Sequence, residues 1–138
     1  MKIKLIDFGA KELGFYPTRK HYNDAGADVY ALEDVYLDPG DVYSFGLGFG
    51  IELPDGYMGL IFPRSSMSAA GLTTELPPID SGYKGEIHGV LTNNSNMPKR
   101  ITKGDRIGQL VITPIILADF VDDLGTERGT GAFGSTGK

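Results

Sequence analysis

Short runs of β-forming residues, separated by turn residues, occupy most of this sequence and constrain its fold more than any other feature. The 138 residues include 20 Gly and 8 Pro, and helical periodicity is scarce. Alternating or β-branched runs predict strands in the segments 2–6, 27–32, 35–37, 42–53, 57–62, 85–93 and 106–117. Strands this short at this spacing are typical of an all-β sandwich, jelly roll or barrel.

The segment RSSMSAAG (64–71) favours a helix instead. A Ser stands at a plausible N-cap, the interior residues tolerate a helix, and Gly71 stands where a helix would end. The backbone N–H groups at the start of such a helix would point outward and attract an anion. We therefore expect one short helix in an otherwise β domain.

The charge and composition exclude several classes of function. A net charge of −5 disfavours general binding to nucleic acid or to an anionic membrane, but allows one small anionic ligand in a locally basic pocket. The chain has no Cys, so it has no disulfide framework and no thiolate metal site. Residues 1–10 lack the apolar run of a signal peptide, and no stretch approaches the ~18 apolar residues of a membrane span. We expect one cytoplasmic domain of ordinary size.

The tetrapeptide PRSS (63–66) combines an Arg with two hydroxyl side chains. Arg64 would supply a planar fork of donors, and Ser65 and Ser66 would supply hydroxyls, which together suit a phosphate. The same residues also suit a capped surface helix with a solvated Arg. The tetrapeptide alone leaves both interpretations open.

The segment PPIDSGYKGE (77–86) places a carboxylate among turn residues. Pro77 and Pro78 favour a hairpin or a bend over a central strand. Asp80, ionised at neutral pH, would act as a general base by holding a water molecule in line with its target. An Asx-turn without a catalytic role is the alternative.

Other polar residues lie beside or within predicted strands. Asp28 stands near the start of one strand, and Gln109 lies among apolar residues of another, where its amide needs a partner if it is buried. Turn chemistry and strand alternation explain both equally well. His21 and His88 are the only histidines and give little support for zinc, and the sequence has no G-x-S-x-G motif and no Walker A loop.

Five short motifs occur in an order that resembles a known family. They are similar to the five ordered motifs of the trimeric dUTP pyrophosphatases (dUTPases), and they read AGADVYA (25–31), PRSS (63–66), IDSGYKGE (79–86), GDRIGQLV (104–111) and RGTGAFGSTG (128–137). The resemblance implies a jelly-roll-like β domain over residues 1–124 and a flexible C-terminal active-site arm over residues 125–138. It also implies a homotrimer in which each active site collects residues from all three subunits. The implied reaction is hydrolysis of dUTP to dUMP and pyrophosphate with Mg²⁺ on the triphosphate, which keeps uracil out of DNA and supplies dUMP for thymidylate synthesis.

The resemblance also assigns roles to individual residues. Asp80 matches the Asp that orients and deprotonates the attacking water at the α-phosphorus. Tyr83 matches the ring beneath the deoxyribose that leaves no room for a ribose 2′-hydroxyl. Asp28 matches a carboxylate that supports the metal–phosphate network indirectly, with no direct protein ligand to the metal expected. The remaining contacts implied are those to the phosphates, from Arg64, Ser65, Ser66, Gln109, Arg128, Ser135 and Thr136, and those to the base, from Pro78, Ile79, His88 and Phe133.

The chain departs from the family pattern at three positions. Thr74 stands where many members have Asn, and Pro77 stands where Gly is common, so the hairpin that reads uracil is altered. Ala132 replaces the usual Gly before the aromatic residue of the arm. We expect recognition of the base to depend largely on backbone groups, so these changes need not abolish it.

Two other functions compete with dUTP hydrolysis. A dCTP deaminase shares the fold but would need a catalytic Glu where this chain has Val90. A regulatory binding protein on the same scaffold is the second alternative, with residues 8–24 as its first candidate partner surface. The glycine-rich tail is either a linker or an active-site arm. Arg128 and Phe133 favour the arm, because an arm would use the charge of the first and the stacking face of the second, and a linker would use neither.

Overall fold

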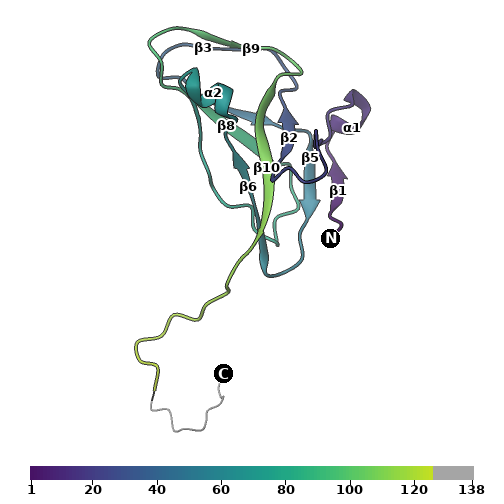
Figure 1. Ribbon diagram of the computed structural model, residues 1–138, viewed down its shortest axis with the longest axis vertical. Helices are drawn as coiled ribbons and strands as arrows, with labels where there is room; N and C mark the ends of the chain where they lie inside the picture. Colours follow the sequence, from purple (N-terminus) through teal and green to yellow (C-terminus); the bar gives the residue numbers. More distant parts are fainter. Residues whose placement is uncertain (126–138) are drawn as a thin grey trace.

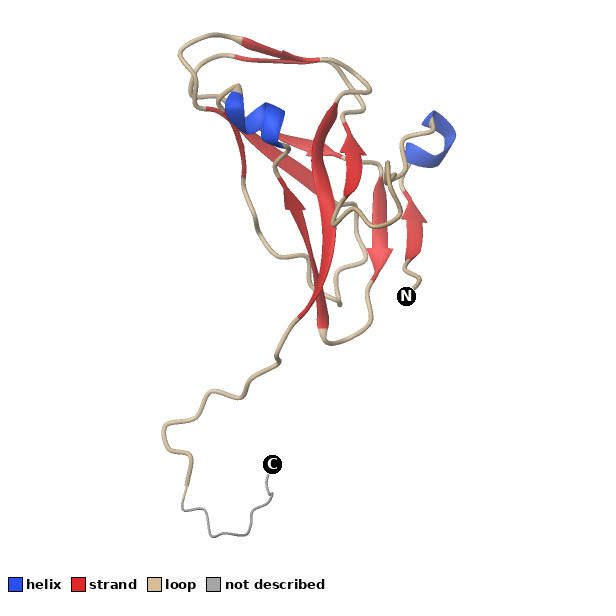
Figure 2. Cartoon of the chain, in the orientation of Figure 1, coloured by secondary structure: helices blue, strands red, loops and turns tan. Residues whose placement is uncertain are grey.

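The computed structural model describes residues 1–125, which form ten strands and two short helices (Figure 1 and Figure 2). In chain order the elements are β1 (Lys4–Asp7), α1 (Ala10–Leu13), β2 (Ala27–Tyr30), β3 (Val35–Leu37), β4 (Val42–Gly46), β5 (Phe49–Glu52), β6 (Tyr57–Phe62), α2 (Ser65–Ala69), β7 (Leu72–Thr74), β8 (His88–Asn93), β9 (Lys99–Ile101) and β10 (Arg106–Pro114). The all-β class expected from the sequence is confirmed. Over residues 1–125, no helix has the length and apolar character that crossing a membrane requires.

The strands form two three-stranded sheets and two two-stranded ribbons, and every pairing between them is antiparallel. One sheet has the order β2-β10-β6, the other has the order β4-β8-β7, and the ribbons are β1-β5 and β3-β9. Most neighbours are distant in the sequence, so the chain crosses repeatedly between sheets, as in jelly-roll-like folds. The long strand β10 lies between β2 and β6 in the middle of the molecule (Figure 1).

Inward-facing side chains of the strands form one hydrophobic core. Strand β8 shows the expected alternation, since Gly89, Leu91 and Asn93 are buried while the residues between them are not. Asn93 is a buried polar residue whose amide group donates to the carbonyl oxygens of Leu37 and Met97, each at 2.9 Å. The largest fully buried apolar side chains of the domain are Phe45, Phe49, Leu37, Leu47, Ile51, Leu91, Ile107 and Val29.

The prediction of a single strand over residues 42–53 is wrong, because this segment forms β4 and β5 in different sheets. Gly48 separates the two strands with a φ of +75°, a left-handed conformation that glycine adopts without steric cost. Its carbonyl oxygen accepts the N–H groups of Phe8 and Ala10 at 2.8 and 3.0 Å. This kink leaves β4 paired with β8 and redirects β5 to pair with β1.

The helix expected over residues 64–71 is present as α2, although its N-cap is Arg64 and not a serine. The helix ends before Gly71, whose φ is +83°. The second helix, α1, was not expected from the sequence. It begins where the carboxylate of Asp7 accepts the N–H groups of Gly9 and Lys11 at 2.8 and 3.2 Å. Strands β7 and β9, of three residues each, were also not predicted from the sequence.

Beyond β10 the chain leaves the body of the molecule (Figure 1). The segment 115–125 carries large apolar side chains that are exposed, with Phe120 97% and Leu124 89% accessible, and with Ile116, Leu117 and Val121 also exposed.

Candidate active site

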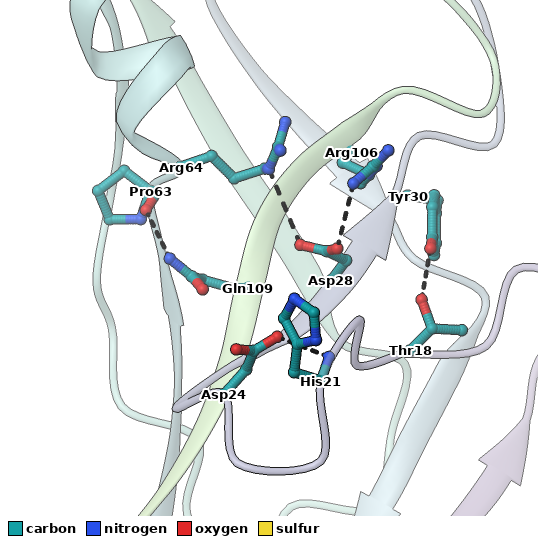
Figure 3. Close-up of polar contacts among 9 residues, drawn as sticks. All are labelled: Thr18, His21, Asp24, Asp28, Tyr30, Pro63, Arg64, Arg106 and Gln109. Carbon is teal, nitrogen blue, oxygen red and sulfur yellow. Dashed lines mark hydrogen bonds and ion pairs between the residues drawn. The ribbon is translucent and has the colours of Figure 1, made fainter.

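Asp28 lies between two arginines in the structure (Figure 3). The Nε atom of Arg64 is 3.8 Å from Asp28 Oδ1, and the Nη1 atom of Arg106 is 3.6 Å from Asp28 Oδ2. The Asp28 side chain is 21% exposed, while both arginines are more accessible. Because two guanidinium groups share one carboxylate, the cluster is locally positive and suits an anion on an otherwise acidic protein.

The register of the β2-β10-β6 sheet explains why these side chains meet. Gln109 on β10 pairs with Asp28 on one side and with Phe62, the last residue of β6, on the other. Arg64 follows β6 closely and therefore reaches Asp28 across β10 (Figure 3). The Nε2 atom of Gln109 donates to the carbonyl oxygen of Pro63 at 3.2 Å. One strand thus brings together three residues that the sequence proposed separately.

Arg106 belongs to this cluster although the sequence analysis did not single it out. In a regular strand, Arg106 and Gln109 would point to opposite faces, because they are an odd number of positions apart. The pairing of β10 with β2 shifts register between Arg106 and Gly108, and this irregularity carries the Arg106 side chain to Asp28. Arg106 belongs to the GDRIGQLV motif, but regular strand alternation would place its side chain on the face opposite to Gln109.

Gly26 keeps the space beside Gln109 free. A Cβ atom at Gly26 would lie 2.8 Å from both Cβ and Oε1 of Gln109, which is closer than real Cβ contacts. Ser65 and Ser66 follow Arg64 directly and are exposed in the first turn of α2.

A pocket of about 270 Å³ lies beside Asp80. The loop that carries Asp80 is tied to β6, because Ile79 N donates to Gly59 O at 2.7 Å and Gly59 N donates to Ile79 O at 3.0 Å. The N–H group of Tyr83 donates to the carbonyl oxygen of Asp80 at 3.0 Å and closes the turn. The pocket is lined by Ile61, Glu75, Pro77, Pro78, Ile79, Asp80, Tyr83, Glu86, Ile87, His88 and Val90.

Four of the expected base and sugar contacts, Pro78, Ile79, Tyr83 and His88, line this pocket, and so do two carboxylates that the sequence analysis missed. Tyr83 donates its hydroxyl to the Glu86 carbonyl oxygen at 2.6 Å, and His88 Nδ1 lies 3.2 Å from the same oxygen. The carboxylate of Glu86 accepts the N–H of Gly48 at 2.8 Å. Glu75 also lines the pocket, from the hairpin that departs from the family pattern. Neither Glu stood out in the sequence, because a surface strand or turn commonly carries Glu.

Thr74 faces away from the pocket. It pairs with Leu91, a core residue, and its hydroxyl is buried without a hydrogen-bond partner among the described residues. Glu75 follows with its N–H donating to Val90 O at 3.1 Å, and both residues line the pocket. The position that carries Asn in many dUTPases therefore holds a side chain buried on the core side of β7.

The two groups of residues are far apart within one chain. Ile79 is hydrogen-bonded to Gly59, which lies near the start of β6, whereas Arg64 follows the end of that strand. At about 3.3 Å per residue, the separation between Gly59 and Arg64 is roughly 16 Å. Asp80 extends this separation, because its loop runs antiparallel to β6. Asp80 and Arg64 of one chain therefore lie toward opposite ends of β6.

The sequence proposals for the C-terminal arm concern residues outside the described range, namely Arg128, Ala132, Phe133, Ser135 and Thr136. Within residues 1–125, no three His, Cys, Asp or Glu side chains are grouped in a way that would hold a metal ion.

Comparison with known proteins places this site in context. A family model for dUTPases matches residues 14–137. A deoxyuridine 5′-triphosphate nucleotidohydrolase from Thermobifida fusca is 47% identical over 128 residues, which cover 88% of this chain and 72% of that protein. The protein of the same name from Corynebacterium glutamicum is 45% identical over an alignment of 145 residues, which covers 100% of this chain and 95% of the Corynebacterium protein.

Solved structures show the same similarity. A dUTPase from phage phi11 of Staphylococcus aureus, described with a coordinated structural Mg(II) ion, superposes with a TM-score of 0.83 at 25% identity and covers 93% of this chain and 100% of its own. A dUTPase from Staphylococcus bacteriophage 80alpha superposes with a TM-score of 0.82 at 26% identity, with 92% and 99% covered.

Proposed function

We propose that this chain, which belongs to the dUTPase family, hydrolyses dUTP to dUMP and pyrophosphate by attack of a water molecule held at Asp80. Relatives about 45% identical over most of the chain carry the name of this activity. The observation that carries the mechanism is the pocket that has Asp80 and Tyr83 in its lining. A pyrimidine and its deoxyribose would occupy the pocket, and the α-phosphorus would then lie beside Asp80.

Asp80 would act mainly by orientation. An ionised Asp is a weak base, so its effect depends on holding the water in line with the α-phosphorus. The bonds between Ile79 and Gly59, and the turn closed by Tyr83, support this role because they fix the backbone on both sides of Asp80. The Tyr83 ring would pack beneath the sugar, where a ribose 2′-hydroxyl would collide with it.

Arg64 and Arg106 would bind the phosphates beyond the α-phosphorus. Asp28 holds one guanidinium on each of its oxygens, so it would orient both donors toward the same anion. Gln109, bonded to Pro63 O, would contribute from the neighbouring position on β10. Ser65, Ser66 and the arm residues named above would supply the remaining contacts.

We further propose that each site is shared between copies of the chain in a homotrimer. The separation of roughly 16 Å along β6 supports sharing, because the Arg64 of a neighbouring copy can lie closer to Asp80 than the Arg64 of the same chain does. The exposed side chains of Phe120 and Leu124 support it as well, since a neighbouring copy would cover them. A sedimentation mass near one 14.9 kDa chain would contradict this assembly.

Mg²⁺ is the metal we propose for the reaction, carried by the triphosphate. The donor set fits this arrangement, because the described residues offer no cluster of carboxylates and imidazoles and Asp28 is already engaged by two arginines. Phosphate oxygens and water are ligands that Mg²⁺ accepts readily. When bound, the ion would neutralise charge on the phosphates, and Asp28 would influence it only through the arginines.

The test is pyrophosphate release from dUTP, dCTP, dTTP and UTP, measured with Mg²⁺ and with a chelator. We expect turnover of dUTP that depends on Mg²⁺ and exceeds that of the other nucleotides. Asp80→Asn should lose turnover and retain binding of dUTP, measured by calorimetry. Equal or faster turnover of another nucleotide would refute the specificity, and wild-type turnover by Asp80→Asn would require another base.

A further inference from the structure

The sequence FGLGFG (45–50) places glycine at every second position. Two of these glycines leave space for residues 85 and 86, which follow Tyr83 in the chain. A Cβ atom at Gly46 would lie 2.8 Å from Glu86 Oε2, and one at Gly50 would lie 2.5 Å from Gly85 O. Neither Gly46 nor Gly50 has a positive φ, so close approach of another segment, and not backbone conformation, requires glycine there. Residues 85 and 86 therefore pack directly against β4 and β5.

Glu86 connects this packing to Tyr83. Its part-buried carboxylate accepts the N–H of Gly48 at 2.8 Å, and its carbonyl oxygen accepts the hydroxyl of Tyr83 at 2.6 Å. The Tyr83 ring also lies close over Gly85, because a Cβ atom there would be 2.7 Å from the Tyr83 hydroxyl oxygen. A continuous chain of contacts thus runs from Gly48, through Glu86, to the outer end of the ring.

We infer that Glu86 is a positioning residue that determines sugar specificity by holding the Tyr83 ring at a fixed depth beneath the sugar. This inference rests on the proposed function, in which Tyr83 excludes a ribose 2′-hydroxyl. A steric exclusion works only if the excluding group cannot yield. Tyr83 is 46% exposed in the chain, so packing alone does not immobilise it, and the tether to Glu86 supplies the missing restraint.

The experiment compares kcat/KM for dUTP with kcat/KM for UTP in Glu86→Ala and Glu86→Gln. Glu86→Ala removes the hydrogen bond from the N–H of Gly48 to the charged Glu86 carboxylate, which fixes the backbone carbonyl that Tyr83 contacts. The loss of a hydrogen bond to a charged acceptor should lower the dUTP-to-UTP ratio by roughly tenfold. Glu86→Gln should keep most of the ratio, because the amide oxygen can still accept the N–H of Gly48. Glu52→Ala is the matched control, since it removes a carboxylate that lies at the surface 3.7 Å from Lys4, and it should leave the ratio unchanged.

Two further variants keep the test decisive if Glu86→Ala does not fold. Tyr83→Phe retains the ring and removes its bond to Glu86, and Gly46→Ala places a methyl group against the Glu86 carboxylate. Both should lower the ratio mainly by raising turnover of UTP. An unchanged ratio in these folded variants, or an equal fall for both nucleotides, would overturn the role of Glu86. A wild-type protein that fails to hydrolyse dUTP would instead refute the proposed function.

Discussion

Two inactive variants of this chain should restore activity when they are assembled together. Arg64 and the Asp80 loop lie at opposite ends of β6, roughly 16 Å apart. In the proposed trimer, each site therefore takes Asp80 from one copy and Arg64 from another. Asp80→Asn removes the first contribution and Arg64→Ala removes the second, so each variant alone has every site impaired.

The size of the recovery follows from random assembly. In an equal mixture of the two variants, about one site in four receives an intact Asp80 from one copy and an intact Arg64 from its neighbour. The mixture should therefore reach about 25% of the wild-type rate. The Asp80→Asn parent should be slower than wild type by roughly 10²–10⁴-fold, the usual contribution of a general base. A recovery to one quarter thus stands far above the background.

The assay is pyrophosphate release after the two variants are unfolded together and refolded. Wild-type chains mixed equally with the double variant Asp80→Asn/Arg64→Ala provide the control, because shared sites predict about one quarter of the wild-type rate and unshared sites predict about one half. No recovery in the first mixture, together with one half in the control, would show that each chain builds its own site. That result would refute the argument from the length of β6.

Three other outcomes are expected. The Lys103 N–H, with help from Arg100, holds the pKa of Asp34 below its usual value. The stability that Asp34 contributes is therefore present above about pH 4, and it is lost as the pH falls through the lowered pKa. The difference in melting temperature between wild type and Asp34→Asn should accordingly shrink below about pH 4, and a difference that persists there would contradict this origin. Thr74→Val removes a buried hydroxyl without a described partner and should raise the free energy of unfolding by about 1 kcal/mol in urea titrations, whereas a decrease would reveal a partner. Deletion of residues 126–138 should remove most activity with little change in melting temperature, and normal dUTP hydrolysis would return the tail to the status of a linker.

The sequence predicted those elements whose boundaries are marked by turn residues. The segments 35–37 and 57–62 became β3 and β6 with the expected bounds, because Asp, Pro and Gly stand near their ends. The segment 42–53 did not survive as one strand, because the kink at Gly48 depends on carbonyl contacts with Phe8 and Ala10. Local patterns cannot reveal such a contact between distant segments.

The candidate site shows the same division. The motif order brought Asp28, Arg64 and Gln109 to notice, and the register of β10 places them together. Arg106 escaped because a register shift reversed its direction, and Glu86 escaped because its partner is the backbone N–H of Gly48, in the distant kink between β4 and β5. The arm residues remain predictions, since they lie outside residues 1–125.

The strand order also has a consequence for how the chain reaches this structure. Strand β2 pairs with β10, β1 pairs with β5, and β3 pairs with β9. Each of these early strands therefore cannot pair until a strand later in the chain has been synthesised. Folds dominated by such distant pairings close slowly, typically in milliseconds to seconds. Asp28 cannot meet Gln109 until nearly the whole β domain has left the ribosome. The anion site is therefore among the last features to form during synthesis, and a truncated nascent chain would have no means of binding nucleotide there.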